Sequence, residues 1–258
     1  MSDRQTRTGT AQPPSHQNHY AQAQQAPVAP LDSATDPRPA ARDRQFRFDP
    51  ITHVYTLDGQ VIPGVTTIIK PLFGDWFDRI DPATLEHARE RGTRVHKLTE
   101  LHDDGVYFRL ADSDEAAAYI HAWRRFRSDM HPRIFAAEKS GYHPTLDYGG
   151  TNDRLVIIDG HAGVLDIKTT ADLMPQTAIQ TMGYALIEAA HDDSKLWRRW
   201  AVQLKPSGEY RLERYRDDPY DESVFRACLR VHRHGHSQGA ATAMAWETIN
   251  QWRRAHAA

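Results

Sequence analysis

The stretch GGTNDRLVIIDGHAGVLDIKTT, residues 149–170, contains two runs rich in β-branched and apolar side chains. The runs, residues 154–158 and 161–167, flank the dipeptide Asp159-Gly160. Asp-Gly between two such runs is typical of a two-residue hairpin turn with positive φ at both central positions. The sequence therefore predicts a β-hairpin, around which the other predicted elements are arranged.

Counting outward from this turn sets Leu155 opposite Val164 and Asp153 opposite Asp166. Directly opposed side chains lie about 4.5–5.5 Å apart at Cβ, and two carboxylates there repel each other unless a positive group lies between them. Lys168 follows Asp166 by two residues, so strand alternation places its ammonium group on the same face. We therefore expect two carboxylates and a lysine on one surface of the hairpin.

These residues leave two interpretations of that surface open. Mg²⁺ commonly binds one or two carboxylates together with water and substrate phosphate, so Asp153 and Asp166 can form a metal site. Alternatively, Asp153 caps a turn, Asp166 ends a strand and Lys168 pairs with one of them. The second role is the more common one for an isolated Asp-x-Lys tripeptide.

Apolar side chains occupy both faces of the predicted hairpin. Strands with this pattern need cover on both sides, which predicts a sheet between helices. One face carries Val156, Ile158, Leu165 and Ile167, and the other carries Leu155, Ile157, Ala162 and Val164.

Upstream of this hairpin, a second Asp-Gly turn at Asp58-Gly59 follows the alternating residues Phe46 and Phe48 and predicts a smaller hairpin. A short apolar helix is expected over residues 65–72. Asp81 as N-cap and Pro82 at the first helical position then predict a longer helix. Its expected inner stripe consists of Leu85, Ala88, Gly92, Val95, Thr99 and His102.

His96 borders this stripe, and Gly92 one turn earlier is expected to let the helix approach the sheet closely. A further helix over residues 114–130 precedes a strand over residues 133–140 that contains Glu138. On sequence alone, Glu138 is more simply explained as a solvent-facing strand residue.

The helix expected over residues 175–190 has Pro175 in its first turn. Gln176, Gln180 and Tyr184 recur every four residues and so share one edge of it. Amide and phenol groups there can hydrogen-bond a phosphate or a water molecule, or form an ordinary polar edge. Strands over residues 196–204 and 210–215 and helices from residue 221 onward complete the prediction.

Five short motifs, taken in order, resemble the PD-(D/E)xK nuclease superfamily, in particular its RecB-like and phage exonuclease branch. Gly150-Thr151-Asn152-Asp153, Asp166-Ile167-Lys168-Thr169 and the pair Gln180 and Tyr184 match the three central motifs of that branch. The helix segment with Gly92 and His96 and the opening over residues 54–69 supply the other two. The resemblance covers residues 46–205.

The resemblance implies an α/β fold with a central mixed sheet of four to five strands flanked by helices, a restriction-endonuclease-like core. It also implies Mg²⁺-dependent hydrolysis of DNA phosphodiester bonds, with Mn²⁺ as a substitute. In this assignment the metal ligands are His96, Glu138, Asp153, Asp166 and the carbonyl of Ile167. Lys168 orients the nucleophile or offsets charge on the phosphate, and Gln180 and Tyr184 position the strand.

Within this superfamily, the resemblance favours a phage or prophage exonuclease acting on linear duplex or single-stranded DNA in recombination or repair. Such an enzyme is expected to work with a single-strand annealing or recombination protein, and oligomers are common in the family. A structure- or site-specific endonuclease of the same fold, a catalytically inert DNA-binding scaffold and an unrelated α/β domain are the alternatives.

The composition limits how the protein can contact DNA. The chain has 258 residues, a formal charge of −2 and a pI near 6.7, so contacts to DNA must come from local clusters rather than from a basic protein as a whole. Local candidates are Arg198, Arg199, Lys205, Arg211 and Arg214 for the phosphates and Trp197 and Trp200 for the bases, although charged strand edges are commonly just solvated.

The single cysteine, Cys228, lies among apolar residues and is expected in the core. One cysteine also excludes a four-cysteine iron–sulfur cluster. No signal peptide or membrane-spanning run is evident, so we expect a cytoplasmic protein without membrane contact. His232, His234 and His236 lack the spacing of a zinc site. Residues 1–44 are expected to form a disordered tail before a single nuclease domain, residues 45–258.

Overall fold

The structure is a computed structural model that describes residues 44–193, 197–235 and 239–256. The chain divides into two compact units, Met1–Asp36 and Pro37–Ala258, and the first lies outside the described residues. The expected disordered tail, residues 1–44, also lies outside them, apart from Arg44.

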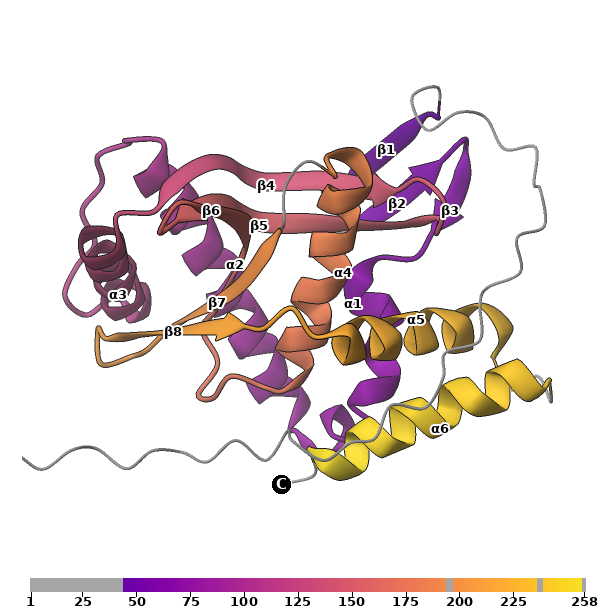
Figure 1. The fold of residues 1–258 in the computed structure, drawn as a ribbon. Helices are drawn as coiled ribbons and strands as arrows, with labels where there is room; N and C mark the ends of the chain where they lie inside the picture. Colours follow the sequence, from indigo (N-terminus) through magenta and orange to yellow (C-terminus); the bar gives the residue numbers. More distant parts are fainter. Residues whose placement is uncertain (1–43, 194–196, 236–238, 257–258) are drawn as a thin grey trace, which may run out of the picture. The chain divides into compact units, whose positions relative to one another are not determined.

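A five-stranded mixed sheet forms the centre of the second unit (Figure 1). Its strands lie in the order β4 (Arg133–His143), β5 (Tyr148–Ile158), β6 (His161–Lys168), β7 (Arg198–Leu204) and β8 (Tyr210–Tyr215). Strands β6 and β7 pair in parallel and the other neighbours are antiparallel. The predicted α/β class with a mixed sheet of four to five strands is confirmed.

The central hairpin has the predicted turn and register. Asp159 and Gly160 have φ values of 51° and 77°, and Leu155 pairs with Val164. A turn with two positive φ values matches the right-handed twist of the strands it joins. The ladder between β5 and β6 ends at Arg154 and Leu165, one step before the expected pairing of the two aspartates.

At that next step a side chain replaces the backbone pairing. Oδ2 of Asp153 accepts a hydrogen bond of 2.6 Å from the backbone N–H of Ile167. The two strands therefore separate at the end of the hairpin, because a carboxylate lies between them. The prediction that Asp153 and Asp166 pair directly across the two strands is therefore wrong.

Helices cover both faces of the sheet, as expected from its two apolar faces. Figure 1 shows α4 (Gln176–His191) across one face and α2 (Pro82–Asp103) and α3 (Glu115–Met130) on the other. The first face packs with α1 (Val65–Ile68), α5 (Pro219–His234) and α6 (Ala240–Ala255), and this core includes Leu155, Val164 and Cys228. The second core includes Val156, Ile158, Leu165 and Ile167.

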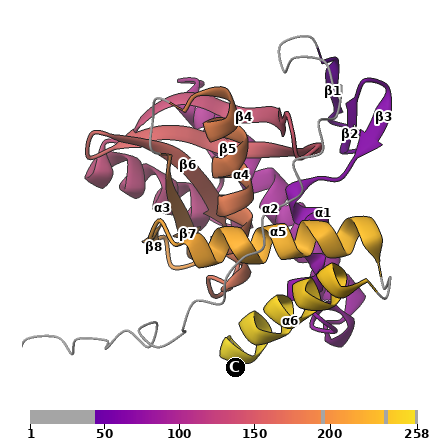
Figure 2. The ribbon, with the colours of Figure 1, turned by 45° about the vertical axis from the view of Figure 1, so that its right-hand side comes forward.

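The smaller sheet contains β1 (Phe46–Asp49), β2 (Val54–Leu57) and β3 (Gln60–Ile62), with the predicted turn at Asp58-Gly59 (Figure 2). The ring of Tyr55, a residue of β2, packs directly on Gly149 of β5. A Cβ on Gly149 would lie 2.7 Å from that ring, so this position requires glycine.

The helix expected over residues 65–72 is divided into α1 and a 3₁₀ turn, η3 (Lys70–Leu72). Pro71 lies in the first turn of η3, where its missing N–H costs no hydrogen bond. A second 3₁₀ turn, η4 (Phe77–Arg79), leads to α2, whose N-cap Asp81 accepts from the Thr84 N–H at 2.9 Å as predicted. No helix in the described ranges is long and apolar enough to cross a membrane.

Several expected DNA contacts are core residues instead. Trp197 is 7% exposed and Trp200 is 3% exposed, so neither offers a face to a base. Arg199 is 1% exposed and pairs with Asp221 at 2.9 Å. These three predictions are wrong. Arg199 and Trp200 lie in β7, the second strand from the sheet edge, which is covered on both faces, and Trp197 lies just before this strand and is buried with it. Arg198 pairs with Asp217, and Arg211 pairs with Glu213 at 2.8 Å.

Candidate metal centre

The regular alternation of side chains along β5 is interrupted at Asp153. Asn152 Nδ2 donates to Glu188 Oε1 of α4 at 2.9 Å, whereas Arg154 Nε donates to Asp103 Oδ2 of α2 at 2.7 Å. Residues two apart on a regular strand share a face, so the strand rotates between these two. Asp153 lies at the rotation and is directed to the end of the hairpin.

The neighbouring strand β4 is irregular at the same level. Ala137 pairs with Arg154 and Lys139 pairs with Asn152, which leaves Glu138 at the level of Asp153. Glu138 has a φ of 45°, a left-handed conformation that costs a non-glycine residue of order 1–3 kcal/mol. The irregularity turns its carboxylate toward Asp153 instead of continuing the alternation of the strand.

His96 reaches both carboxylates from α2. Its Nδ1 lies 3.5 Å from Asp153 Oδ1 and 3.9 Å from Glu138 Oε1. Its Nε2 lies 3.0 Å from the carbonyl oxygen of Ile167. An Nε2–H bond to that carbonyl orients the ring so that Nδ1 faces the two carboxylates, which is the usual arrangement of a metal-binding histidine.

We call His96, Glu138 and Asp153 the acidic cluster. One ligand atom from each lies within 4.8 Å of the others, so the three can hold a metal ion. All three side chains are partly exposed, at 28%, 35% and 13%. One imidazole nitrogen and two carboxylate oxygens fit a divalent cation that favours oxygen ligands.

The charges of the cluster act on its histidine. Burial disfavours the charged imidazolium, but Asp153 and Glu138 outweigh this effect and raise the pKa of His96 to about 9. The imidazolium is therefore the only positive group of the acidic cluster itself. A metal ion bound at Nδ1 would replace its proton.

Beside the acidic cluster lie Asp166, Lys168, Gln180 and Tyr184, which we call the lysine relay. Lys168 Nζ lies 2.8 Å from Asp166 Oδ2 and donates to Gln180 Oε1 at 3.0 Å. Gln180 Nε2 then donates to the Tyr184 hydroxyl at 3.1 Å. The end of β6 and one edge of α4 are thus joined through polar side chains.

Burial controls the protonation of this relay. It raises the pKa of Asp166 to about 6, in opposition to the nearby Lys168 ammonium. Burial acts against the charge of Lys168 as well, but Asp166 and Asp153 outweigh it and hold the pKa of Lys168 above its usual value. Both groups are therefore charged at pH 7 to 8. Burial also raises the pKa of Tyr184 well above its usual range, so its hydroxyl is neutral.

Two glycines of the predicted motifs behave differently. A Cβ on Gly150 would lie 2.9 Å from the ring of Tyr184, so glycine is needed there for α4 to approach β5. A Cβ on Gly92 would lie 3.7 Å from Thr169 Oγ1, which is ordinary contact. The expected role of Gly92 in bringing α2 close to the sheet is therefore wrong, although His96 does reach the carboxylates.

Arg154 was not anticipated as part of this region. It is fully buried and donates to Asp103 Oδ2, to Thr99 Oγ1 at 3.0 Å and to Glu138 Oε1 at 3.2 Å. Asp103 Oδ1 in turn accepts from Arg127 at 2.8 Å. We call Thr99, Asp103, Arg127 and Arg154 the arginine network. A charged residue on the apolar face of a buried strand was the signal available in the sequence.

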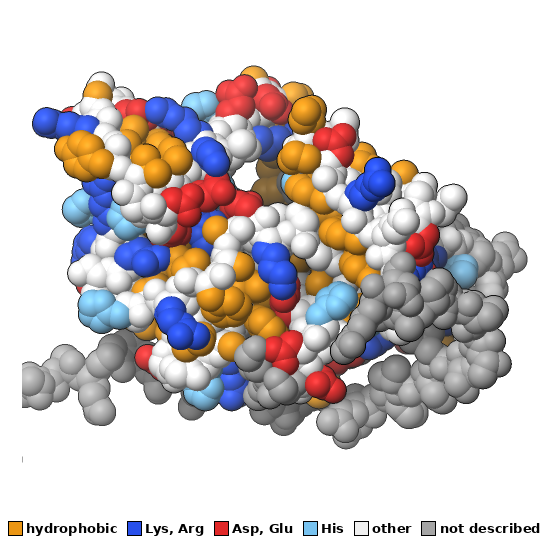
Figure 3. Space-filling model, turned by 90° about the horizontal axis from the view of Figure 1, so that it is seen from above, with side chains coloured by type: hydrophobic (Ala, Val, Ile, Leu, Met, Phe, Trp, Pro, Cys, Tyr) orange, Lys and Arg blue, Asp and Glu red, His pale blue; other side chains and the backbone are white. Residues whose placement is uncertain are grey.

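The structure brings together the residues that the sequence analysis proposed for the site, but in two groups. Glu138 lies in the acidic cluster, whereas Asp166 pairs with Lys168 beside it. Gln176 is directed elsewhere, since its Nε2 lies 3.5 Å from the carbonyl of Leu72. On the face seen in Figure 3, acidic side chains gather at the rim of a hollow and Lys and Arg side chains are interspersed.

Comparison with known proteins shows similarity to solved structures and to no family model. No family model matches the chain, and no curated protein matches it. LHK-Exo in complex with dAMP is 15% identical, with a TM-score of 0.33, over 75% of this chain and 92% of the other. LHK-Exo, an alkaline exonuclease from Laribacter hongkongensis, is 14% identical in a second structure, with a TM-score of 0.32, over 74% of this chain and 91% of the other.

Proposed function

We propose that this protein is a divalent-metal-dependent deoxyribonuclease. The observation that carries the proposal is the meeting of the acidic cluster with the ion pair of Asp166 and Lys168 at the end of one hairpin. Partly exposed carboxylates can hold a cation there, and the partly exposed ammonium group of Lys168 lies beside them. A metal cation and an ammonium group near one phosphate can together stabilise the negative charge that develops during phosphodiester hydrolysis.

The ligands proposed for the metal are His96 Nδ1 and the carboxylates of Glu138 and Asp153, with Asp166 next to them. The Ile167 carbonyl already accepts from His96 Nε2, so it serves to orient this ligand. Mg²⁺ is the cation proposed, with Mn²⁺ as a substitute, because the set is dominated by carboxylates. When bound, such a cation supplies Lewis-acid stabilisation of the charge that develops on the phosphate oxygens.

The protein's own groups supply positioning and charge. Lys168 is held between Asp166 and Gln180, so its ammonium is fixed beside the expected phosphate position and offsets negative charge in the transition state. Gln180 and Tyr184 place polar groups along the same edge of α4 and are proposed to align the strand being cut.

The finer assignment follows the sequence resemblance. We propose an exonuclease of the phage or prophage type, which degrades linear DNA in recombination or repair and works with an annealing or recombination protein. An endonuclease of the same fold is the second candidate, and the motif residues are common to both.

The test is degradation of three substrates: an end-labelled linear duplex, its single strand and a closed circular plasmid. Each is incubated with Mg²⁺ or with a chelator, and with wild type, Lys168→Ala or the control Lys70→Ala, an exposed lysine in η3, which packs against α5 and α6. We expect loss of linear DNA only with Mg²⁺, an intact circle, wild-type activity of Lys70→Ala and a loss of at least 100-fold for Lys168→Ala, as for removal of one transition-state donor. Binding of DNA by Lys168→Ala should be retained.

Other outcomes lead to different conclusions. Cutting of the circle moves the protein to the endonuclease candidate. Equal loss of binding and turnover in Lys168→Ala contradicts the role of Lys168. No cleavage by folded wild-type protein that still binds DNA replaces the proposal with the inert scaffold.

A further inference from the structure

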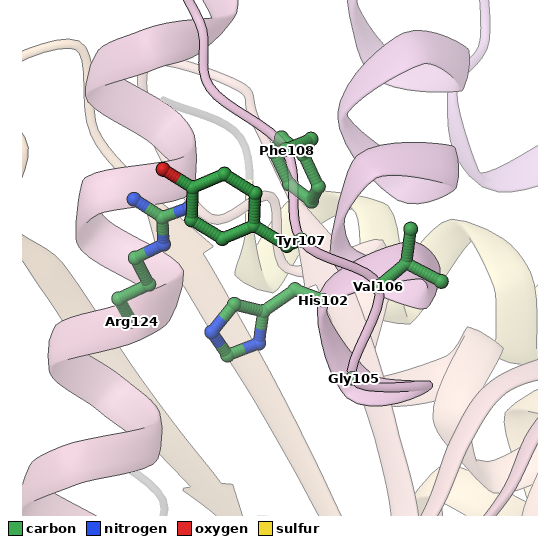
Figure 4. A pocket seen from close by; sticks show the side chains of 6 residues that line it. All are labelled: His102, Gly105, Val106, Tyr107, Phe108 and Arg124. Carbon is green, nitrogen blue, oxygen red and sulfur yellow. The ribbon is translucent and has the colours of Figure 1, made fainter.

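The segment that joins α2 to α3 contributes to a pocket of about 280 Å³ (Figure 4). This size is just below the range of about 300–1,000 Å³ that is typical of small-molecule sites, and it suits a single planar ring system. The pocket is lined by His102, Gly105, Val106, Tyr107, Phe108 and Arg124.

The side chains of this pocket combine exposed aromatic surface with positive charge. Tyr107 is 90% exposed, so both faces of its ring are accessible to a ligand. The guanidinium of Arg124 lies over the ring of Phe108, 5.5 Å from its centroid. Figure 4 shows the Tyr107 ring projecting from the connecting segment, with His102 on α2 and Arg124 on α3 beside it.

Aromatic rings beside arginine form the usual platform for single-stranded nucleic acid. Every base has a flat face that can stack on a ring, and the guanidinium contacts the phosphate or stacks in turn. A paired base in a duplex cannot offer its face in this way. The chemistry of the pocket therefore selects an unpaired nucleotide.

Shared side chains connect the pocket to the candidate metal centre. His102 Nδ1 lies 3.6 Å from Asp103 Oδ1, and Asp103 Oδ2 accepts from Arg154. Arg154 also contacts Glu138 of the acidic cluster. Along α2, six residues separate His102 from His96, or about 9 Å of helix axis. At about 3.4 Å per stacked nucleotide this is two to three nucleotides of one strand.

We propose that the pocket binds an unpaired nucleobase of the DNA strand that is cut at the candidate metal centre. The base stacks on Tyr107, and Arg124 contacts the backbone next to it. This inference rests on the proposed function and adds a substrate class to it: a strand with at least a few unpaired nucleotides beside the scissile phosphate. Blunt duplex must fray before it fills the pocket.

The test measures the anisotropy of a fluorescein-labelled oligothymidylate and of a blunt duplex of equal length, both in chelator so that no strand is cut. We expect Tyr107→Ala to weaken binding of the single strand by about tenfold or more, as for loss of one stacked base. Tyr107→Phe should bind as wild type does. Arg124→Ala should also weaken binding, whereas its neighbour Arg125→Ala, which does not line the pocket, serves as the matched control.

Each outcome separates this inference from the proposed function. Wild-type protein that cuts DNA with Mg²⁺, together with a Tyr107→Ala variant that binds the single strand as tightly as wild type, overturns the pocket alone. Equal weakening for single strand and blunt duplex overturns the selection of unpaired bases. Equal effects of Arg124→Ala and Arg125→Ala remove Arg124 from the site. Wild-type protein that neither binds nor cuts DNA rejects both proposals.

Discussion

The acidic cluster and the arginine network lie side by side and share two elements, α2 and β5, yet their charges are balanced differently. In the arginine network, Asp103 is 5% exposed and meets two guanidinium groups, those of Arg127 and Arg154. In the acidic cluster, two carboxylates meet one imidazole, and all three side chains are partly open to solvent. The carboxylate of the arginine network is thus closed to solvent and paired with two cations, whereas those of the acidic cluster remain accessible to a ligand.

This difference separates a stabilising role from a binding role. Buried ions are tolerated only where partners and hydrogen bonds compensate their lost hydration, as they do around Arg154. The carboxylates of the acidic cluster lie close together, stay partly exposed and share one histidine, an arrangement that can bind a cation. Arg154 belongs to both regions, because the same guanidinium also contacts Glu138.

The largest expected effect is a loss of stability in the arginine network. Arg154→Met keeps the length of the side chain but leaves Asp103 buried with less compensation, and we expect a loss of about 3–5 kcal/mol in the free energy of unfolding. Chemical denaturation in chelator measures it, with the exposed Arg125→Ala as control. A loss no larger than that of the control would mean that Arg154 contributes no net stability.

The second prediction concerns His96 in metal-free protein. Its folded pKa of about 9 exceeds the unfolded value of about 6.5, so protonation favours the folded state. The contribution, on the order of 3 kcal/mol, is fully present below pH 6.5 and disappears as the pH rises through 9. The melting temperature of wild type relative to His96→Gln should therefore fall between pH 6.5 and 10. A difference independent of pH would separate His96 from the two carboxylates.

The third prediction concerns binding of a divalent cation to the acidic cluster. Mg²⁺ or Mn²⁺ at a hundred times its dissociation constant should stabilise the wild type by about 2.7 kcal/mol relative to chelator. Asp153→Asn and Glu138→Gln should lose this shift, because each removes a ligand of the acidic cluster. Arg127→Lys, in the arginine network, should keep it. Melting curves with and without metal test this, and an unchanged curve for wild type argues against a metal site.

The smallest expected effect is a loss of stability from the N-terminus of α2, the helix that both regions share. Asp81 caps α2, which carries His96 as well as Asp103, and Asp81→Ala should cost about 1 kcal/mol of stability. Because the cap lies at the far end of the helix, the metal-induced shift should stay as in wild type. Loss of that shift would show that the position of α2 depends on its first turn.

The two hairpins show how far local sequence can determine the fold. Asp58-Gly59 and Asp159-Gly160 adopt nearly the same φ angles, and each turn was predictable because few dipeptides tolerate two positive values. The apolar pattern around Asp159-Gly160 further predicted cover on both faces. What it did not predict is the loss of alternation at Asp153, which depends on hydrogen bonds to two different helices.

The sequence predicted which residues belong to the candidate site better than it predicted how they are arranged. The motifs identified Asp153, Asp166 and Lys168, but the position of Glu138 depends on a left-handed backbone that no local signal announces. Trp197 and Trp200 were misassigned because burial of a strand depends on its place in the sheet order. Side-chain type alone does not give that order.

The parallel pairing of β6 with β7 has a consequence for how the protein acquires activity. Parallel neighbours need a crossover, here α4, and the lysine relay exists only once this helix has folded back on the sheet. His96 and Ile167, which meet at the centre, are 71 residues apart in the chain. Contacts of such long range form slowly, so in refolding the central hairpin should appear well before the proposed nuclease activity returns.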